Sequence, residues 1–141
     1  MQLDDLYRQV IMDHYQHPRN VGELAADAIT VDLRNPSCGD EIKLQLQVKD
    51  GVVTDARFRG SGCSISMASA SMMTEAVKGL PIAEALALSR SFRAMMRGEE
   101  PDRDLGDLEA LQGVSKFPAR IKCATLAWQA LEKAVRPQPA E

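Results

Sequence analysis

The sequence predicts an α+β fold in which helices cover one face of a three-stranded antiparallel sheet. Three stretches of alternating apolar and polar residues follow one another closely between residues 29 and 58, which is typical of a meander. Elsewhere apolar residues recur at helical spacing, so only helices remain to cover the sheet. We expect a single domain over residues 1–141, with a flexible tail at about 137–141, because 141 residues suit one core.

The first expected element is an amphipathic helix over residues 3–16. Its stripe consists of four apolar or aromatic side chains and one histidine: Leu3, Leu6, Tyr7, Val10 and His14. Pro18 ends the helix, because the residue before a proline disfavours helical backbone. His14 either packs at the helix end or reaches the functional site, and the pattern leaves both roles open.

The three strands come next in the chain. Residues 29–33 alternate as a short strand, which stops at the Asn-Pro turn of residues 35–36. Residues 42–48 alternate more regularly, so the second strand should have one solvent-exposed face. Asp50-Gly51 predicts a two-residue hairpin turn, and residues 52–58 continue as the third strand with their even-numbered side chains on the apolar face.

Helices occupy the second half of the chain. Gly60 to Cys63 ends the sheet and opens a helix whose apolar stripe extends to Val77. Pro81 is expected in the first position of the following helix. A polar connector at residues 98–104 precedes a short helix that Gly113 closes. The last three helices are therefore expected over residues 81–96, 105–113 and 115–135.

Composition and charge exclude several classes of function. The net charge is -3 with scattered Lys and Arg, so no long-range field favours nucleic acid. No apolar run approaches the ~20 residues that a membrane helix needs. The first residues lack the basic and apolar regions of a secretory signal, so we expect a cytoplasmic protein. In a reducing cytoplasm, three cysteines serve as ligands or nucleophiles more often than as disulfides.

The candidate site consists of three thiols and one carboxylate: Cys38, Asp40, Cys63 and Cys123. Such a set is complete for tetrahedral zinc and labile for iron. Cys38 and Asp40 flank a glycine, so one tight loop could bring both to the same ion. Cys63 lies at a helix N-terminus, where the dipole and free N–H groups favour a thiolate. A turn and a helix cap with buried thiols would explain the same residues, since free Cys often packs as a small hydrophobe.

Arg120 is the cation best placed to serve the thiols. It precedes Cys123 by three residues and lies on roughly the same face of the last helix. A guanidinium there would support the thiolate of Cys123 or a bound anionic sulfur species. It would also be an ordinary surface charge, because exposed Arg is common.

The surroundings of all three cysteines resemble those of one family. The runs Asn-Pro-Ser-Cys-Gly-Asp at 35–40 and Gly-Cys-Ser-Ile-Ser-Met-Ala-Ser at 62–69 are similar to the U-type iron–sulfur assembly proteins, which include IscU, SufU and the NifU N-terminal domain. The lone cysteine of the last helix and residues 13–22 extend the likeness over essentially the whole chain. Lys122 occupies the position where IscU-type scaffolds carry a histidine. Residues 97–107 form an additional segment, because the IscU-type scaffolds have fewer residues between the second and third cysteines. Both features, with the run at 120–128, look like the SufU branch.

The resemblance implies an IscU-like domain that acts as a zinc-dependent sulfurtransferase with the cysteine desulfurase SufS. It implies zinc held by Cys38, Asp40, Cys63 and Cys123, and a histidine of SufS that takes the place of Cys38 on the metal. Cys38 would then accept the persulfide sulfur, with Arg120 as a candidate support, and downstream Suf scaffold proteins are further candidate partners. The sequence also favours Cys38 as the ligand that leaves the metal, because Cys38 is expected on a glycine-containing loop, whereas Cys63 and Cys123 are expected to begin helices.

Two other functions use the same residues. The first is an iron–sulfur scaffold that binds iron and a transient 2Fe–2S cluster, although the missing histidine at Lys122 removes one cluster ligand of that branch. The second is a purely structural zinc site, which closure by four ligands favours and an aspartate ligand disfavours. No nucleic acid or membrane partner is expected for any of the three.

Overall fold

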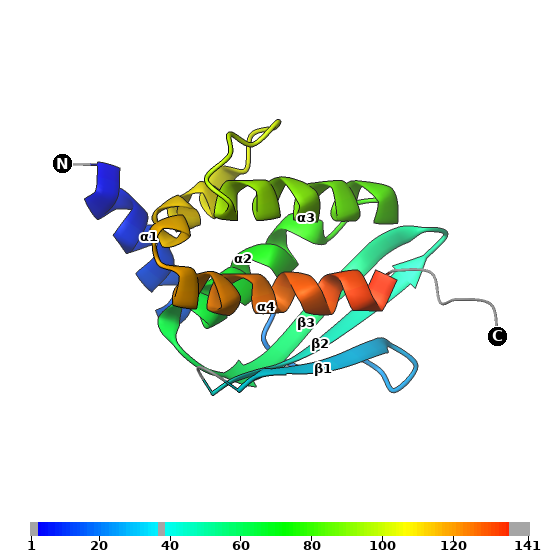
Figure 1. Ribbon diagram of the computed structural model, residues 1–141. Helices are drawn as coiled ribbons and strands as arrows, with labels where there is room; N and C mark the ends of the chain where they lie inside the picture. The colour runs from blue at the N-terminus through cyan, green and yellow to red at the C-terminus, as the bar shows by residue number, and fades with distance from the viewer. Residues whose placement is uncertain (1–2, 37–38, 136–141) are drawn as a thin grey trace.

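A computed structural model describes residues 3–36 and 39–135 of the chain, with side chains from residue 7 onward. It confirms the expected α+β class, with helices on a three-stranded antiparallel sheet (Figure 1). The elements in chain order are α1 (Leu3–Gln16), β1 (Ile29–Asn35), β2 (Asp40–Lys49), β3 (Val52–Ser61), α2 (Ser64–Val77), α3 (Ile82–Met96), the 3-10 helix η1 (Gly106–Lys116) and α4 (Pro118–Val135). No helix among the described residues is long and apolar enough to cross a membrane.

The sheet is a meander in the order β1-β2-β3, with both pairs antiparallel. Asp50 and Gly51 join β2 to β3 with φ angles of 53° and 76°, the left-handed backbone that a two-residue hairpin turn needs. At the opposite end, Asn35 pairs with Asp40 and Glu41 pairs with Ser61. The last residues of β1 and β3 therefore lie beside the first residues of β2, at one end of the sheet.

The third strand contains a bulge that the sequence pattern does not reveal. Gln47 pairs with Asp55 and Val48 pairs with Val53, so Thr54 is the extra residue on β3. As a result Val53 faces the core and is fully buried, while Thr54 is exposed. The expectation that the even-numbered residues of 52–58 share the apolar face is therefore wrong before the bulge and correct for Ala56 and Phe58 after it.

The hydrophobic core lies between the sheet and the helices. Helices α2 and α4 pack against the sheet, and α3 lies on their far side (Figure 1). Trp128 of α4 stacks on Phe92 of α3 with ring centroids 4.8 Å apart, and its indole N–H donates to the Ser69 hydroxyl. Ser69 in turn donates to the carbonyl of Ala124 over 2.6 Å, which joins α2 to α4 beside Cys123.

The segment after α1 partly covers the face of the sheet that was expected to be exposed. Val21 forms a parallel bridge with Phe58, and the amide of Leu24 donates to Gln45 Oε1 over 2.8 Å. Gln45 is consequently buried, although it lies on the polar face of β2. The expectation of a fully exposed face is wrong at this position because the residues between α1 and β1 cross it.

Two helix boundaries also differ from expectation. Pro81 is the N-cap of α3 rather than its first helical residue. The expected short helix is a longer 3-10 helix that passes Gly113 and ends at Lys116. Leu108, Leu111 and Val114 are buried and recur every three residues from the N-cap Leu105, the repeat of a 3-10 helix, so these side chains align along one face. Ala110 is buried beside them.

Candidate metal centre

Asp40, Cys63 and Cys123 converge although they are far apart in the sequence. One donor atom from each lies within 4.8 Å of the others. Asp40 begins β2, Cys63 immediately precedes α2, and Cys123 lies in the second turn of α4. The starts of these three elements lie at the same end of the molecule, on the left of Figure 1. Asp40 and Cys123 are fully buried, whereas Cys63 is partly accessible.

The two oxygens of Asp40 have different surroundings. Oδ1 accepts the backbone N–H of Cys63 at 3.0 Å and the hydroxyl of Ser66 at 3.1 Å. Oδ2 is buried and has no hydrogen-bond partner among the described residues. A buried carboxylate oxygen without a donor is costly, and a cation would satisfy it. This oxygen and the two thiols are the donor set that zinc accepts, so the residues present fit a metal ion.

The two thiols are held by helix starts. Cys63 is the N-cap of α2, and its own side chain makes no capping hydrogen bond; the carboxylate of Asp40 accepts its backbone N–H. The Cys63 thiol donates weakly to Ser66 Oγ over 3.7 Å, and the Cys123 thiol contacts the carbonyl of Ala119 at 3.9 Å. Neither thiol lies in a disulfide. Both sulfurs are therefore available as metal ligands.

Arg120 lies beside both thiols, as its spacing from Cys123 predicted. Its electrostatic interaction with Cys63, followed by a hydrogen bond to Cys123, raises the pKa of Arg120 above its ordinary value. The arginine itself is exposed to solvent. Arg120 therefore interacts with Cys63 and Cys123 and is at the same time exposed at the molecular surface. Its role in supporting a thiolate or a persulfide stays a prediction.

Cys38 lies outside the described residues, so its expected part in the site is not tested. Chain connectivity places it two residues before Asp40, within the connection that closes the β1–β2 hairpin. That connection ends at Gly39, whose amide donates to the carbonyl of Asn35 over 2.9 Å and whose φ is 72°.

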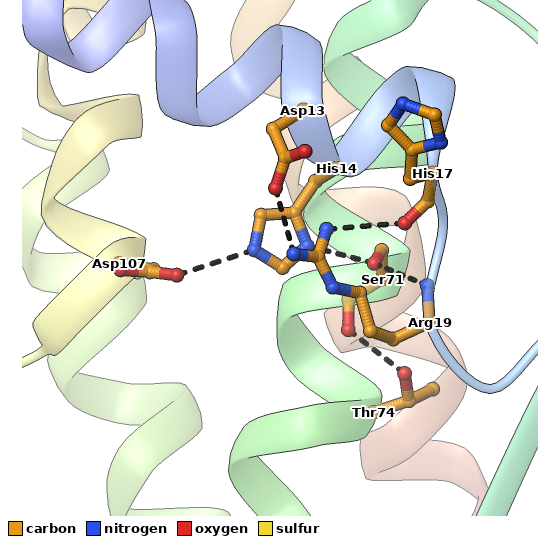
Figure 2. Close-up of polar contacts among 7 residues, drawn as sticks. All are labelled: Asp13, His14, His17, Arg19, Ser71, Thr74 and Asp107. Atoms are coloured by element: carbon orange, nitrogen blue, oxygen red, sulfur yellow. Dashed lines mark hydrogen bonds and ion pairs between the residues drawn. The ribbon is translucent and has the colours of Figure 1, made fainter.

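His14 does not belong to the converging group. It is buried, and its Nδ1 lies 2.8 Å from Ser71 Oγ while its Nε2 donates to the Asp107 carboxylate over 3.2 Å (Figure 2). These contacts tie α1 to α2 and to η1. Of the two roles that the sequence left open, the structure supports packing.

Gly62 and Ser66 lie within the run at 62–69 that carries the family resemblance, and the structure shows their contacts with the converging group. A Cβ atom at position 62 would lie 2.3 Å from Asp40 Oδ1 and 2.7 Å from Ser66 Oγ. Only glycine leaves the room in which the carboxylate and the hydroxyl meet. The requirement arises from the approach of β2 to the start of α2, which no local sequence pattern records.

A groove of about 760 Å³ opens beside Cys63 and Arg120. Its walls come from α1, η1 and the starts of α2 and α4. They combine apolar side chains with basic ones and include Tyr7, Arg8, Ile11, Met12, Ile65, Val114, Lys116 and the exposed Phe117. The partly accessible thiol therefore faces an opening large enough for a segment of another chain.

Comparison with known proteins identifies the family of this fold and site. The NifU-like N terminal domain matches residues 6–139. The zinc-dependent sulfurtransferase SufU of Bacillus subtilis is 64% identical over 94% of this chain and 91% of its own. The iron–sulfur cluster assembly scaffold protein IscU of Streptococcus pyogenes is 47% identical over 95% of this chain and 85% of its own. The crystal structure of an iron–sulfur cluster assembly scaffold protein for the SUF system from Fervidobacterium islandicum has a TM-score of 0.87 and 32% identity, and covers 96% of this chain and 100% of its own.

The orphaned oxygen of Asp40 leads to a prediction for Asp40→Asn. An amide keeps an acceptor for the Cys63 N–H and Ser66 hydroxyl but removes a buried charge, so the metal-free variant should melt no lower than the unaltered chain. Added zinc should raise its melting temperature far less, because an amide is a poor zinc ligand. Thermal melts of chelator-treated protein with and without zinc would measure both effects.

Glu41→Gln is the matched control, because Glu41 adjoins Asp40 but is half exposed and pairs with Arg34 at the surface. That variant should lose little stability and keep its full response to zinc. A full zinc response in Asp40→Asn would remove the carboxylate from the candidate site.

Proposed function

We propose that this chain, which belongs to the NifU-like N terminal domain family, is a zinc-dependent sulfurtransferase of iron–sulfur cluster assembly. The observation that carries the proposal is the convergence of two thiols with a buried carboxylate that has one oxygen without a hydrogen-bond partner among the described residues. The 64% identity to a protein named zinc-dependent sulfurtransferase SufU supports the same reaction class. Its sulfur donor is the persulfide of a cysteine desulfurase, for which we propose SufS, and the reaction belongs to the cytoplasm, where thiols are kept reduced.

Four residues would hold the zinc: Cys38, Asp40, Cys63 and Cys123. Asp40, Cys63 and Cys123 already lie together, and Cys38 is two residues from Asp40 along the chain. Zinc bound there would keep the thiols deprotonated at neutral pH without adding redox chemistry. Because a thiolate is the form of cysteine that attacks a persulfide, the site is prepared for sulfur transfer before the donor arrives.

The proposed step is a thiol–persulfide exchange at Cys38. Its thiolate attacks the outer sulfur of the desulfurase persulfide, and a new S–S bond forms at Cys38. The partner's own S–S bond breaks, and its electron pair stays on the partner's cysteine as a thiolate. Cys38 is the acceptor because it lies in the short connection between strands, whereas Cys63 and Cys123 are held by the backbones of α2 and α4. No external oxidant or reductant is consumed, and a downstream Suf scaffold would then receive the sulfur.

Arg120 would hold the sulfur anions during this exchange. Its guanidinium lies beside Cys63 and Cys123 and is also exposed to the groove in which a partner segment would fit. A fixed cation favours a bound persulfide anion over the neutral form. Arg120 therefore supports the incoming sulfur without taking a place among the metal ligands.

An iron–sulfur scaffold is the second candidate function. The observation in its favour is the 47% identity to a protein named as the scaffold IscU. It would use the same carboxylate and thiols, with iron and sulfide as cargo. Lys122 disfavours the scaffold function, because a lysine cannot replace the histidine ligand that the IscU-type scaffolds carry at this position.

Metal content separates the two candidates. Protein purified from an iron-replete host without added metal should contain about one zinc per chain and no colour, because the closed thiolate-rich set suits zinc. Elemental analysis with a visible absorption spectrum is the measurement. Brown protein that contains iron and lacks zinc would support the scaffold instead.

The identity of the sulfur acceptor is tested by Cys38→Ser. After incubation with SufS and cysteine, peptide mass spectrometry of the trapped protein should place the extra sulfur on Cys38. The Cys38→Ser variant should abolish the stimulation of SufS, because a hydroxyl cannot carry a persulfide. Extra sulfur on Cys63 or Cys123, together with normal stimulation by the variant, would contradict the assignment.

Arg120→Gln tests the cation. We expect zinc content to stay unchanged and the rate of sulfur transfer from SufS to fall on the order of tenfold, because a positioned cation stabilises developing negative charge. Lys122→Gln removes the same charge from an exposed neighbour of Cys123 and should leave the rate unchanged. Equal rates for the two variants would assign Arg120 to the general surface charge.

A further inference from the structure

Ser66 contacts two of the converging residues at once. It is the third residue of α2 and is buried, with 2% of its surface exposed. Its Oγ lies 3.1 Å from Asp40 Oδ1, 3.7 Å from Cys63 Sγ and 3.1 Å from the carbonyl oxygen of Cys63. Its hydroxyl carries one proton, and the carboxylate is the strongest of these acceptors. The Ser66 hydroxyl therefore donates its hydrogen bond to Asp40 Oδ1.

This hydrogen bond makes the carboxylate asymmetric. Oδ1 receives two donors, the Cys63 N–H and the Ser66 hydroxyl, and Oδ2 receives none among the described residues. A partial rotation of the carboxylate, which would turn both oxygens toward one ion, would weaken both hydrogen bonds. Gly62 adds a steric condition, because any side chain there would collide with Oδ1 and with Ser66 Oγ. The local structure thus holds one oxygen still and leaves the other free.

We propose that Ser66 is a positioning residue for the metal, which restricts Asp40 to a single-oxygen ligand through Oδ2. The inference rests on the proposed function in so far as that function requires a bound zinc. A single carboxylate oxygen among thiolates matches the four-coordinate geometry of zinc, whereas ions that prefer many oxygen ligands gain from a carboxylate that offers both. Ser66 therefore contributes to zinc affinity without touching the ion.

A purely structural role for Ser66 would have a different signature. A hydroxyl that only joins β2 to α2 would affect the stability of the metal-free protein and leave its intrinsic affinity for zinc unchanged. Loss of an outer partner of a metal ligand typically weakens metal binding 10–100-fold. Zinc affinity and melting temperature must therefore be measured separately.

The experiment compares Ser66→Thr with Ser66→Val, because the two side chains have the same shape and differ in the hydroxyl. The chelator-stripped full chain is titrated with zinc in competition with a chromophoric chelator. Its cobalt complex is examined by visible absorption spectroscopy, and its metal-free melting temperature is recorded. We expect Ser66→Val and Ser66→Ala to bind zinc about 10–100-fold more weakly, with altered cobalt bands, and Ser66→Thr to stay close to the unaltered chain.

Ser71→Ala is the matched control on the same helix. Ser71 is equally buried, and its hydroxyl contacts His14 and the amide of Arg19 rather than a candidate ligand (Figure 2). Its loss should lower the melting temperature and leave zinc affinity and cobalt bands unchanged. If Ser66→Ala behaves like this control, Ser66 is only a structural residue and the inference is overturned.

The outcomes separate this inference from the proposed function. Tight zinc binding by the unaltered chain with equal affinities for Ser66→Thr and Ser66→Val would overturn the role of Ser66 alone. Absence of zinc binding by the unaltered chain would overturn the proposed function, and the inference with it. Because the Thr and Val variants are compared with each other, any strain from the added methyl group cancels.

Discussion

The hydrogen bond between the Cys63 N–H and the Asp40 carboxylate is the contact on which the site depends. It joins the first residue of β2 to the residue that caps α2, over a distance of 3.0 Å. A helix N-terminus needs acceptors for its free N–H groups and favours a negative charge, so the carboxylate satisfies the helix. The same bond fixes the carboxylate, because it occupies Oδ1 and leaves Oδ2 without a partner among the described residues. One hydrogen bond therefore both satisfies the N-terminus of α2 and fixes the position of the Asp40 carboxylate.

The rest of the fold brings the third residue to that pair. Cys123 comes from α4, and its place relative to α2 is set by the hydrogen bond from Ser69 to the Ala124 carbonyl and by the indole of Trp128, which donates to Ser69. The stack of Trp128 on Phe92 continues this contact into α3. The core between α2 and α4 therefore acts on the site directly, because a shift of α4 would move Cys123 away from Asp40 and Cys63.

Sequence patterns predicted those features that local chemistry determines. The Asp50-Gly51 turn, the helix start at Cys63 and the spacing of Arg120 from Cys123 each depend on a few neighbouring residues, and each is found in the structure. The bulge at Thr54 was missed because it depends on the register with β2 rather than on the pattern of β3.

The contacts of Ser66 and Gly62 with Asp40 could not be predicted from the sequence for a related reason. Asp40 is more than twenty residues away from both in the sequence, and the three meet only after β2 pairs with β3. The pairing of Glu41 with Ser61 sets that approach, since it brings the residue before Glu41 to the residue after Ser61. A serine in the first turn of a helix is otherwise an ordinary choice, so its contact with a ligand becomes visible only in three dimensions.

The proposed mechanism depends on a contrast between Cys38 and the three converging residues. Asp40, Cys63 and Cys123 are anchored by a strand and two helices, and hydrogen bonds fix the carboxylate further. A thiolate fully engaged with a metal is a weak nucleophile, so transfer requires one ligand that can leave while the others stay. In the proposed function that ligand is Cys38, which lies outside the described residues, and Arg120 lies beside the two thiols that stay. The proposed transfer at Cys38 would disturb the site less the more firmly the other three residues are placed, so the hydrogen bonds that fix Asp40 would also favour that transfer.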